Sequence, residues 1–381
     1  MSTELPLRGL RVLDLGTVIA GPFAASLLAD LGAEVIKIEP PGVPDGLRRM
    51  GRVKNDVCLW WGVSARDKKS LSLDLKSEAG KAIFRDLVAA SDVMIENFRP
   101  GVLARLGFEW EELKRLNPRL ILLSISGFGQ TGPLSARPGF GKIAEGFSGI
   151  LPLTGPKESR PYFVGFSLAD TSTGMFGAFG VAIALYHRDV LGKAGTRIDL
   201  ALYEPLFRML DAQFLSAGIN GGAAARRGTN DPHGWGLEIT SRSRFLVLKS
   251  RDKKWLFIAL PAKGIDIEDG SDLALTTFVG ERDAAAATEA LRAAGALISP
   301  VLDGGTLATN AYLKERGDVA PATDERLGTF MVPAHVHPPV PNDPRHLFRT
   351  SQSGEDSEAV LRSVLGFDDG KIAQLRQGGV I

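Results

Sequence analysis

A single carboxylate, Asp170, stands between two stretches of the sequence that otherwise hold apolar and small residues. Before it comes the run Val164-Gly165-Phe166-Ser167-Leu168-Ala169, and after it a long apolar stretch extends from Met175 to Tyr186. A carboxylate has a reference pKa of about 3.9, so it is ionised at neutral pH without a general base. It can attack an activated carbonyl such as a thioester if it is positioned and if donors stabilise the developing oxyanion.

Asp170 also has an ordinary structural explanation. The segment before it predicts a strand end or a loop that leads into a buried helix. An aspartate at such a junction can cap the first backbone N–H groups of the helix, and Thr171 and Ser172 are alternative caps. The local sequence leaves the cap and the nucleophile open.

Other residues with chemical potential have weaker patterns. His335 and His337 have a spacing that some metal sites use, but no second histidine cluster or cysteine accompanies them, so we expect no metal site. Asp14 and Glu145 lie in apolar surroundings, where structural carboxylates are commoner than groups that tune a site. Cys58 is the only cysteine, which excludes an intramolecular disulfide and fits a reducing compartment.

The composition is that of a globular enzyme and gives no sign of a polyanionic partner. The 381 residues are 44% hydrophobic and 23% charged, which allows one large core and a smaller one. The net charge is +1 and no basic run carries interleaved aromatic residues, so we expect no nucleic-acid or membrane partner. No signal-like N-terminus is present and no apolar run reaches about 20 residues, so we expect a cytoplasmic location.

Strand and helix patterns alternate in the first third of the chain. This alternation predicts a parallel sheet with crossover helices, and hence an α/β fold with a Rossmann-like, doubly wound large domain. The turn from Gly16 to Pro22 lacks the G-x-G-x-x-G spacing, which disfavours a nicotinamide cofactor. Strands are expected at 11–15, 35–38, 93–95 and 120–125, and helices at 22–31, 77–90 and 109–116.

Changes in composition predict the domain boundaries. The stretch 221–228 is rich in glycine and alanine and has the composition of an exposed connector, and a second connector rich in proline spans 333–344. Residues 244–260 predict a β-hairpin and residues 284–294 a helix. We therefore expect a large domain over 1–220, a smaller α+β domain over 221–330 and a return segment to the large domain over 331–381.

A series of short blocks has a recognisable order along the chain. The series closely resembles family III CoA-transferases, the group that contains formyl-CoA transferase and carnitine CoA-transferase. It is dense over the first 210 residues, thin in the middle and stronger again at the end. The blocks are 7–16, 20–22, 31–40, 68–75, 92–101, 117–121, 126–133, 164–174 and the tail 365–381.

The resemblance implies a site for CoA, as a substrate and not as a tightly bound cofactor. Lys69, Ser70 and Leu71 would border the adenine end, and Arg105 would contact a phosphate. Main-chain groups near Ala20 would line the thioester pocket. The complete set that the resemblance assigns to CoA is Ile19, Ala20, Lys69, Ser70, Leu71, Asn97, Phe98, Arg99, Arg105 and Phe140, although its basic members could also be solvated surface residues.

The resemblance also implies a reaction and an assembly. Asp170 would attack an acyl-CoA donor, pass through an aspartyl anhydride and an aspartyl-CoA thioester, and deliver CoA to an acceptor carboxylate without metal or ATP. The small domain would cap the active site. Two ring-shaped subunits would thread one another in an interlocked homodimer.

Departures from the family pattern leave alternatives open. Many family transferases carry glutamine in place of Ile19 and aspartate in place of Gly141, so we expect a larger or more apolar acyl pocket here. An α-methylacyl-CoA racemase would need a histidine where Phe140 stands. A catalytically silent CoA-ester-binding homologue is the third possibility, because residues 227–236 depart from the family run and a shielding glycine-rich loop is hard to find near 261–264.

Overall fold

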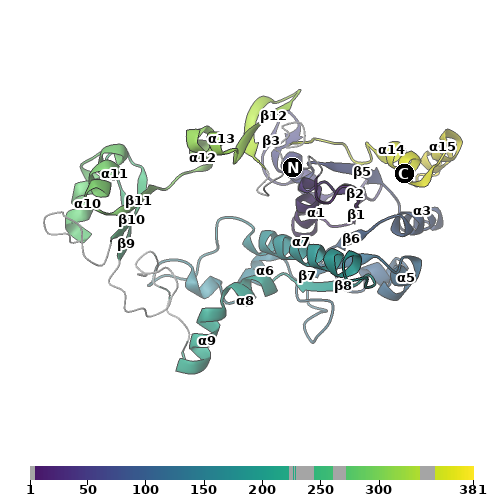
Figure 1. The fold of residues 1–381 in the computed structure, drawn as a ribbon, viewed down its shortest axis with the longest axis horizontal. Helices are drawn as coiled ribbons and strands as arrows, with labels where there is room; N and C mark the ends of the chain where they lie inside the picture. The colour runs from purple at the N-terminus through teal and green to yellow at the C-terminus, as the bar shows by residue number, and fades with distance from the viewer. Residues whose placement is uncertain (1–4, 223–225, 227, 229–243, 261–271, 335–347) are drawn as a thin grey trace. The chain divides into compact units, whose positions relative to one another are not determined.

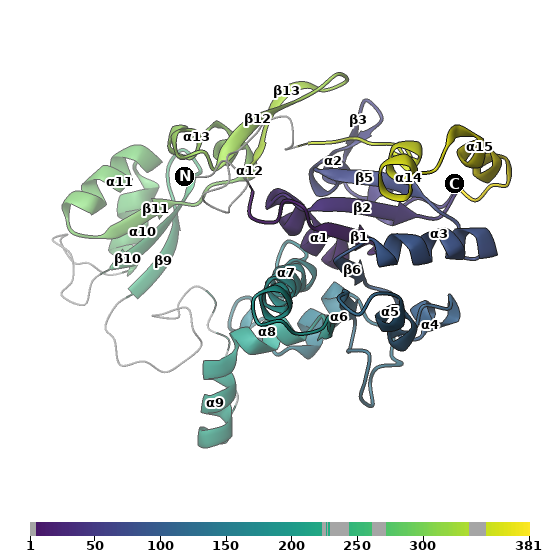
Figure 2. The same cartoon turned by 45° about the vertical axis from the view of Figure 1, so that its right-hand side comes forward.

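The computed structural model describes residues 5–222, 226, 228, 244–260, 272–334 and 348–381. Contacts divide the chain into two units, whose helices and strands are drawn in Figures 1 and 2. The chain leaves the first unit twice and returns to it twice. The first unit comprises Met1–Ala144, Ser167–Leu206 and Ala308–Ile381, and the second comprises Glu145–Phe166 and Phe207–Leu307.

A six-stranded parallel sheet forms the centre of the first unit, in the order β5-β2-β1-β6-β7-β8. This confirms the predicted parallel sheet. The strand order reverses at β1, and such a reversal is where doubly wound sheets open a crevice at the carboxyl ends of their strands. The strands are β1 (Arg11–Asp14), β2 (Glu34–Glu39), β5 (Lys68–Ser72), β6 (Val93–Glu96), β7 (Ile121–Ser126) and β8 (Arg197–Ala201).

Helices cover both faces of this sheet. Alternate strand residues such as Leu13 and Met94 share a buried cluster with Phe84 of α3, whose ring packs on Phe108 at 4.6 Å. The opposite face carries α1 and α7, which contact each other and the strands. The helices of the two layers are α3 (Glu78–Ala89), α5 (Trp110–Leu116), α14 (Ser357–Leu365) and α15 (Asp369–Gln377) on one face, and α1 (Ala20–Asp30) and α7 (Leu168–Asp189) on the other.

Glycines in the first half of α7 let this helix approach its neighbours closely. A Cβ atom at Gly174 would lie 3.0 Å from the carbonyl oxygen of Ala20, in the first turn of α1. A Cβ atom at Gly177 would lie 2.8 Å from the side chain of Leu123 in β7. The small residues noted in the sequence therefore bring the start of α7 against the start of α1.

Helix α7 is also the one described helix that is long and apolar enough to span a membrane by length and composition alone. Of its most apolar window, 44% is buried inside the fold. Core helices of soluble proteins pass the same test, so the finding is weak evidence for a membrane.

The second unit contains a three-stranded antiparallel sheet in the order β11-β10-β9. Leu256 and Ile258 of this sheet form a core with Leu275 and Leu291 of two helices. These elements confirm the predicted hairpin at 244–260 and the predicted helix at 284–294. They are β9 (Arg244–Lys249), β10 (Trp255–Leu260), β11 (Leu297–Pro300), α10 (Asp272–Gly280) and α11 (Ala284–Ala293).

Shorter elements complete the described chain. The hairpin β12–β13, which we expected mostly in the small domain, groups by contacts with the first unit and packs on Val57 and Phe348. The others are η1 (Gly46–Arg49), β3 (Val53–Lys54), β4 (Val57–Cys58), α2 (Leu59–Ser64), α4 (Val102–Arg105), α6 (Gly141–Phe147), η2 (Leu151–Leu153), α8 (Glu204–Met209), α9 (Asp211–Asn220), α12 (Gly304–Thr309), α13 (Ala311–Arg316), β12 (Val319–Asp324) and β13 (Gly328–Pro333).

Candidate active site

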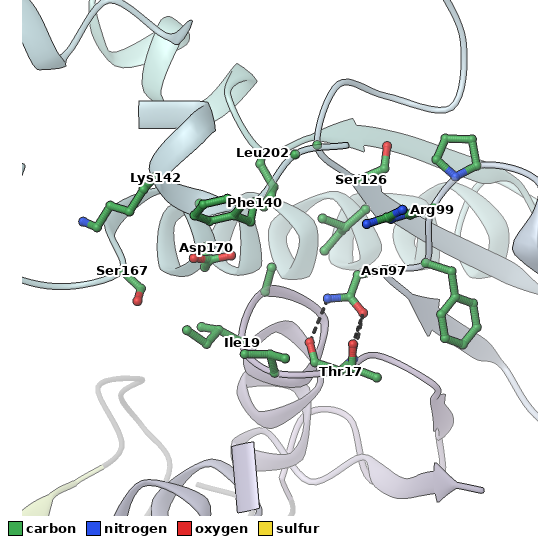
Figure 3. Close-up of a pocket in the computed structure, with 18 of the residues that line it drawn as sticks. Thr17, Ile19, Asn97, Arg99, Ser126, Phe140, Lys142, Ser167, Asp170 and Leu202 are labelled. Carbon is green, nitrogen blue, oxygen red and sulfur yellow. Dashed lines mark hydrogen bonds between the residues drawn. The ribbon is translucent and has the colours of Figure 1, made fainter. Parts of the chain in front are cut away.

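A cavity of about 320 Å³ opens at the carboxyl ends of β1, β6 and β7, where the strand order reverses. Its wall contains the turn after β1, the segment after β6 and the start of α7 (Figure 3). All of these segments belong to the first unit. The sheet therefore brings together residues from three separate parts of the sequence, including Thr17, Asn97 and Asp170.

Seven of the residues assigned from the sequence line this cavity. Asp170 and Phe140 lie near each other in Figure 3, and Asn97 lies beside Thr17. Val18 and Lys142 also line the cavity, and no motif in the sequence marked either residue. The assigned residues in the wall are Ile19, Ala20, Asn97, Phe98, Arg99, Phe140 and Asp170.

The structure does not bring Lys69, Ser70, Leu71 and Arg105 to this cavity. Lys69 forms an ion pair with Glu34 at 2.5 Å. The Ser70 hydroxyl donates to Glu39, and Leu71 is fully buried in the core. These three strand residues make internal contacts, and their assignment to CoA came from the family resemblance, which does not show such contacts.

Asp170 lies inside the first turn of α7 and does not cap it. The N-cap is Ser167, which makes no capping hydrogen bond through its side chain. The hydroxyl groups of Thr171 and Ser172 donate to carbonyl oxygens of the preceding turn, at 2.9 Å and 2.7 Å. The structure therefore excludes the alternative in which Asp170, Thr171 or Ser172 is the N-cap, and the carboxylate stands at the positive end of the helix dipole.

The Asp170 carboxylate lies against the backbone at the start of α6. A Cβ atom built on Gly141 would come 2.1 Å from Oδ2 of Asp170, which is far inside van der Waals contact. Glycine at this position therefore has a steric role, because it leaves space for the Asp170 carboxylate. The sequence alone showed only the missing side chain.

The turn after β1 has an unusual backbone conformation. Val18 has a φ of 64°, in the left-handed region that a β-branched residue rarely adopts. Such a conformation costs about 1–3 kcal/mol and persists only where neighbouring groups enforce it. Two side chains hold the turn in this conformation. Asn97 accepts the Thr17 N–H at 2.7 Å and donates to the Thr17 carbonyl at 2.8 Å. Asp45 accepts the Val18 N–H at 3.0 Å.

Buried charges lie directly beneath this turn. Lys37 donates to the Gly16 carbonyl and forms an ion pair with Asp45 at 2.9 Å. Asp14 accepts the Gly16 N–H at 2.9 Å and pairs with Lys68 at 2.9 Å. Burial lowers the pKa of Lys37, but the attraction of Asp14 and Asp45 outweighs it and raises the pKa above its ordinary value. Lys37 is therefore a fixed cation below the turn.

Glu39 anchors the loop that carries Asp45. Its carboxylate pairs with Arg48 through two hydrogen bonds, of 2.9 Å and 2.7 Å, and accepts the Asp45 N–H at 2.8 Å. The guanidinium of Arg48 also lies 3.8 Å from the centre of the Trp61 ring. The position of Asp45 is thus set by a second buried ion pair.

Helix α1 presents an uncapped N-terminus to the cavity. Its N-cap, Ile19, has no side-chain cap, and its first turn contains no acidic residue. Ile19 and Ala20 both line the cavity, so the first N–H groups of the helix are available to an oxygen that gains negative charge. Asp170 is the only carboxylate among the described lining residues, which also include three cations, Arg99, Arg137 and Lys142. The wall favours an anionic ligand.

The other candidates from the sequence have structural explanations or lie elsewhere. Asp14 is fully buried with Lys68, and the Cys58 thiol is buried near the carbonyl of Leu47 at 3.2 Å. Glu145 is fully buried in α6. Residues 335 and 337, the two histidines, lie outside the described residues, as do most of 227–236 and all of 261–264.

Comparisons with known proteins show the family of this chain. A family model described as CoA-transferase family III matches residues 7–265. The β subunit of succinyl-CoA–L-malate CoA-transferase from Chloroflexus aurantiacus is 34% identical over 100% of this chain and 99% of that protein. The α subunit of that enzyme is 42% identical over 67% of this chain and 58% of its own length. Acetyl-CoA:oxalate CoA-transferase from Acetobacter aceti is 36% identical over 88% of this chain and 92% of that protein.

A solved structure has the same fold. The crystal structure of a CaiB/BaiF family protein from Brucella suis matches with a TM-score of 0.80 and 27% identity, over 95% of this chain and 100% of that one. An α/β enzyme with a central parallel sheet and an anion-binding cavity is the class that the fold and cavity define. The chain belongs to CoA-transferase family III and is an enzyme that transfers CoA.

Replacing Gly141 with alanine should displace the Asp170 carboxylate. We expect kcat for CoA transfer to fall about 10- to 100-fold, because a shift of about 1 Å in a reacting group has an effect of that size. Steady-state kinetics check this. The control is Gly146→Ala on the same helix, where a Cβ atom meets nothing within 4 Å; equal kcat values for the two variants would contradict the steric role.

The buried carboxylates predict acid sensitivity. Burial raises the pKa of Glu39, but Arg48 and the Asp45 N–H outweigh it, so its pKa lies below the ordinary value. A carboxyl group whose pKa is lowered by folding stabilises the protein above its unfolded pKa, and this contribution is lost as the pH falls through the folded pKa. The free energy of unfolding should therefore fall below about pH 4.5, by about 1.4 kcal/mol per pH unit for each proton taken up.

Urea unfolding between pH 7 and pH 3 measures this loss. Glu39→Gln should lower stability at pH 7 and make the acid decline shallower, since one titrating group is gone. Glu315→Gln removes an exposed carboxylate of α13, in the same unit, and should leave the decline as in the parent protein. Parallel curves for the parent and Glu39→Gln would refute the assignment.

Proposed function

We propose that this enzyme transfers CoA between carboxylic acids through covalent intermediates on Asp170. The position of the Asp170 carboxylate carries the proposal. It lies in the cavity wall at the start of α7, close to the uncapped start of α1. A nucleophile and donors for an oxyanion are the two groups that acyl transfer needs.

The reaction would proceed by double displacement. A carboxylate oxygen of Asp170 attacks the thioester carbonyl, forms a mixed anhydride and releases the CoA thiolate. The thiolate attacks the aspartyl carbonyl of the anhydride, which releases the first acid and leaves an aspartyl-CoA thioester. The acceptor carboxylate attacks this thioester to form a second anhydride, and the thiolate then attacks the acceptor acyl carbon, which yields the new CoA ester and regenerates Asp170.

The surrounding residues support this chemistry. The N–H groups at Ile19 and Ala20 would donate to the oxyanion of each tetrahedral intermediate. Asn97, Phe98 and Arg99, which line the cavity, would border CoA. Phe140, which lies near Asp170 in Figure 3, would pack beside the acyl group. Contacts of Lys69, Ser70, Leu71 and Arg105 with CoA rest on the family resemblance alone.

The acyl donor and acceptor are proposed to be dicarboxylic acids larger than oxalate. The similar proteins from Chloroflexus and from Agrobacterium fabrum are named for succinate, malate and glutarate. Ile19 and Gly141 place no polar side chain near Asp170, and Arg137 and Lys142 supply positive charge in the same wall. Assays with formyl, oxalyl, succinyl and glutaryl esters of CoA, with matching acids as acceptors, rank the substrates; preference for formyl-CoA or oxalyl-CoA would contradict the larger pocket.

Racemisation is disfavoured by the composition of the wall. A racemase of this superfamily needs a histidine as the partner of the aspartate, and Phe140 stands at that position. No histidine is found among the described residues that line the cavity. Exchange of the α proton with deuterated solvent, without transfer of CoA, would favour racemisation over CoA transfer.

We further propose that the chain pairs with a second copy of itself, in the interlocked form that the resemblance implies. Helix α7 exposes Met175, Phe179, Ile183 and Tyr186, which recur at helical spacing on one side. The α and β subunits of a relative are both similar to this chain, which supports a like chain as the occupant.

Sedimentation velocity at micromolar concentration tests the pairing. The parent chain should sediment at twice its own mass, and Phe179→Glu with Ile183→Glu should sediment as a monomer with unchanged helix content. A monomeric parent chain, or a variant that remains dimeric, would contradict this surface as the interface.

The nucleophile is tested by trapping. Asp170→Ala should lower the transfer rate at least about 1,000-fold, because the covalent route is lost. In the parent enzyme, hydroxylamine or borohydride added during turnover with succinyl-CoA should modify the peptide that contains Asp170, and no modification should occur without the CoA ester. An unmodified peptide in a protein that still binds CoA would favour the silent homologue.

A further inference from the structure

The Lys37–Asp45 ion pair contacts the turn after β1 on both sides of Thr17. Lys37 and Asp45 are 1% and 5% exposed, and their charged atoms are 2.9 Å apart. The Lys37 ammonium donates to the carbonyl of Gly16, and Oδ1 of Asp45 accepts the N–H of Val18 at 3.0 Å. Neither residue lines the cavity. The pair can therefore affect the cavity only by holding the backbone of the turn.

The backbone that it holds is strained. Val18 has its φ at 64°, and no ordinary preference of valine maintains that value. If the bonds to Gly16 and Val18 were lost, the turn would relax toward a common backbone conformation. Ile19 and Ala20 follow directly, so their N–H groups would turn away from the cavity that they line.

Stability alone does not explain the pair. Burying two charges costs desolvation that their attraction often fails to recover, and apolar replacements of both partners are frequently neutral or stabilising. The first unit also contains the buried pair Arg66–Asp30 at 2.6 Å, in which Asp30 is the last residue of α1 and therefore lies at the opposite end of that helix from the turn. The two pairs are similar in burial and differ in what they touch, which allows a direct comparison.

We propose that Lys37 and Asp45 are positioning residues for the transfer reaction. They fix the left-handed turn at Val18, and through it they aim the N–H groups of Ile19 and Ala20 at the carbonyl that Asp170 attacks. Asn97 completes the restraint by holding both polar backbone groups of Thr17. The inference rests on the proposed function, since the donors matter only if an oxyanion forms in this cavity.

Asp45→Asn is the informative substitution. Oδ1 of Asp45 accepts from both Val18 and Leu47, at 3.0 Å and 2.8 Å, and an asparagine oxygen can keep those bonds. The new amide group would face the Lys37 ammonium, donor against donor, and push the pair apart. We expect kcat to fall about 10- to 100-fold, because displaced oxyanion donors act on the transition state. The KM for succinyl-CoA should change less than about threefold, because ground-state binding does not use them.

Asp30→Asn is the matched control. It breaks the Arg66–Asp30 pair, and Asp30 is 2% exposed, so the loss of stability should be similar. Its kcat per folded enzyme should equal that of the parent. If the two variants lose kcat equally, or if Asp45→Asn changes only KM, the pair is a structural ion pair and the proposal is wrong.

The neutral double variant Lys37→Gln with Asp45→Asn guards against misfolding, because it leaves no unpaired buried charge. If Lys37 and Asp45 act only as a pair, the kcat of the double variant should equal that of the less active single variant. If the fold-loss of kcat in the double variant equals the product of the two single-variant losses, the residues act independently and the proposal is contradicted. Transfer that survives in Asp170→Ala would overturn the proposed function itself, whereas full kcat in the charge variants alongside an inactive Asp170→Ala would overturn only the positioning role.

Discussion

The site depends on a valine held in a left-handed conformation by buried charges. Without Lys37 and Asp45 beneath it and Asn97 beside it, the turn at Val18 has no reason to keep its shape. Burying these groups costs desolvation energy, and the cost is offset by ion pairs and hydrogen bonds that leave little freedom of movement. The same rigid turn leads directly into the start of α1 at the cavity. The contacts that maintain the strained conformation of Val18 therefore also fix the position of the start of α1.

The opposite wall is fixed by close packing. Gly174 lets α7 touch α1 at Ala20, and Asp170 stands one helical turn before that contact. Gly141 then leaves space for the carboxylate. The proposed nucleophile and the proposed oxyanion donors come from the starts of two helices that are in contact, which explains how residues about 150 positions apart meet without a flexible linker.

The sequence predicted most of the sheet because buried parallel strands are continuous apolar runs, as at Val93–Glu96 and Ile121–Ser126. Blocks shared with the family also pointed to Asp170 and the residues around Asn97, which the structure brings to one cavity. The sequence does not reveal tertiary contacts. Ser70 and Leu71, which were assigned to CoA through the family resemblance, are buried in the sheet away from this cavity, and α1 starts at Ala20, before the expected start at Pro22. Nothing local marks Lys37 or Asp45, because their importance comes from a turn that lies elsewhere in the sequence.

The most direct measurement follows an oxygen atom. In the double displacement, the acceptor carboxylate leaves one of its oxygens on the aspartate when the second anhydride is opened by thiolate. Turnover with succinyl-CoA and an oxygen-18-labelled dicarboxylic acceptor should therefore make the Asp170 peptide heavier by about 2 Da for each labelled oxygen retained, as nucleophilic covalent catalysis requires. Complete transfer of CoA without label in that peptide would contradict the account.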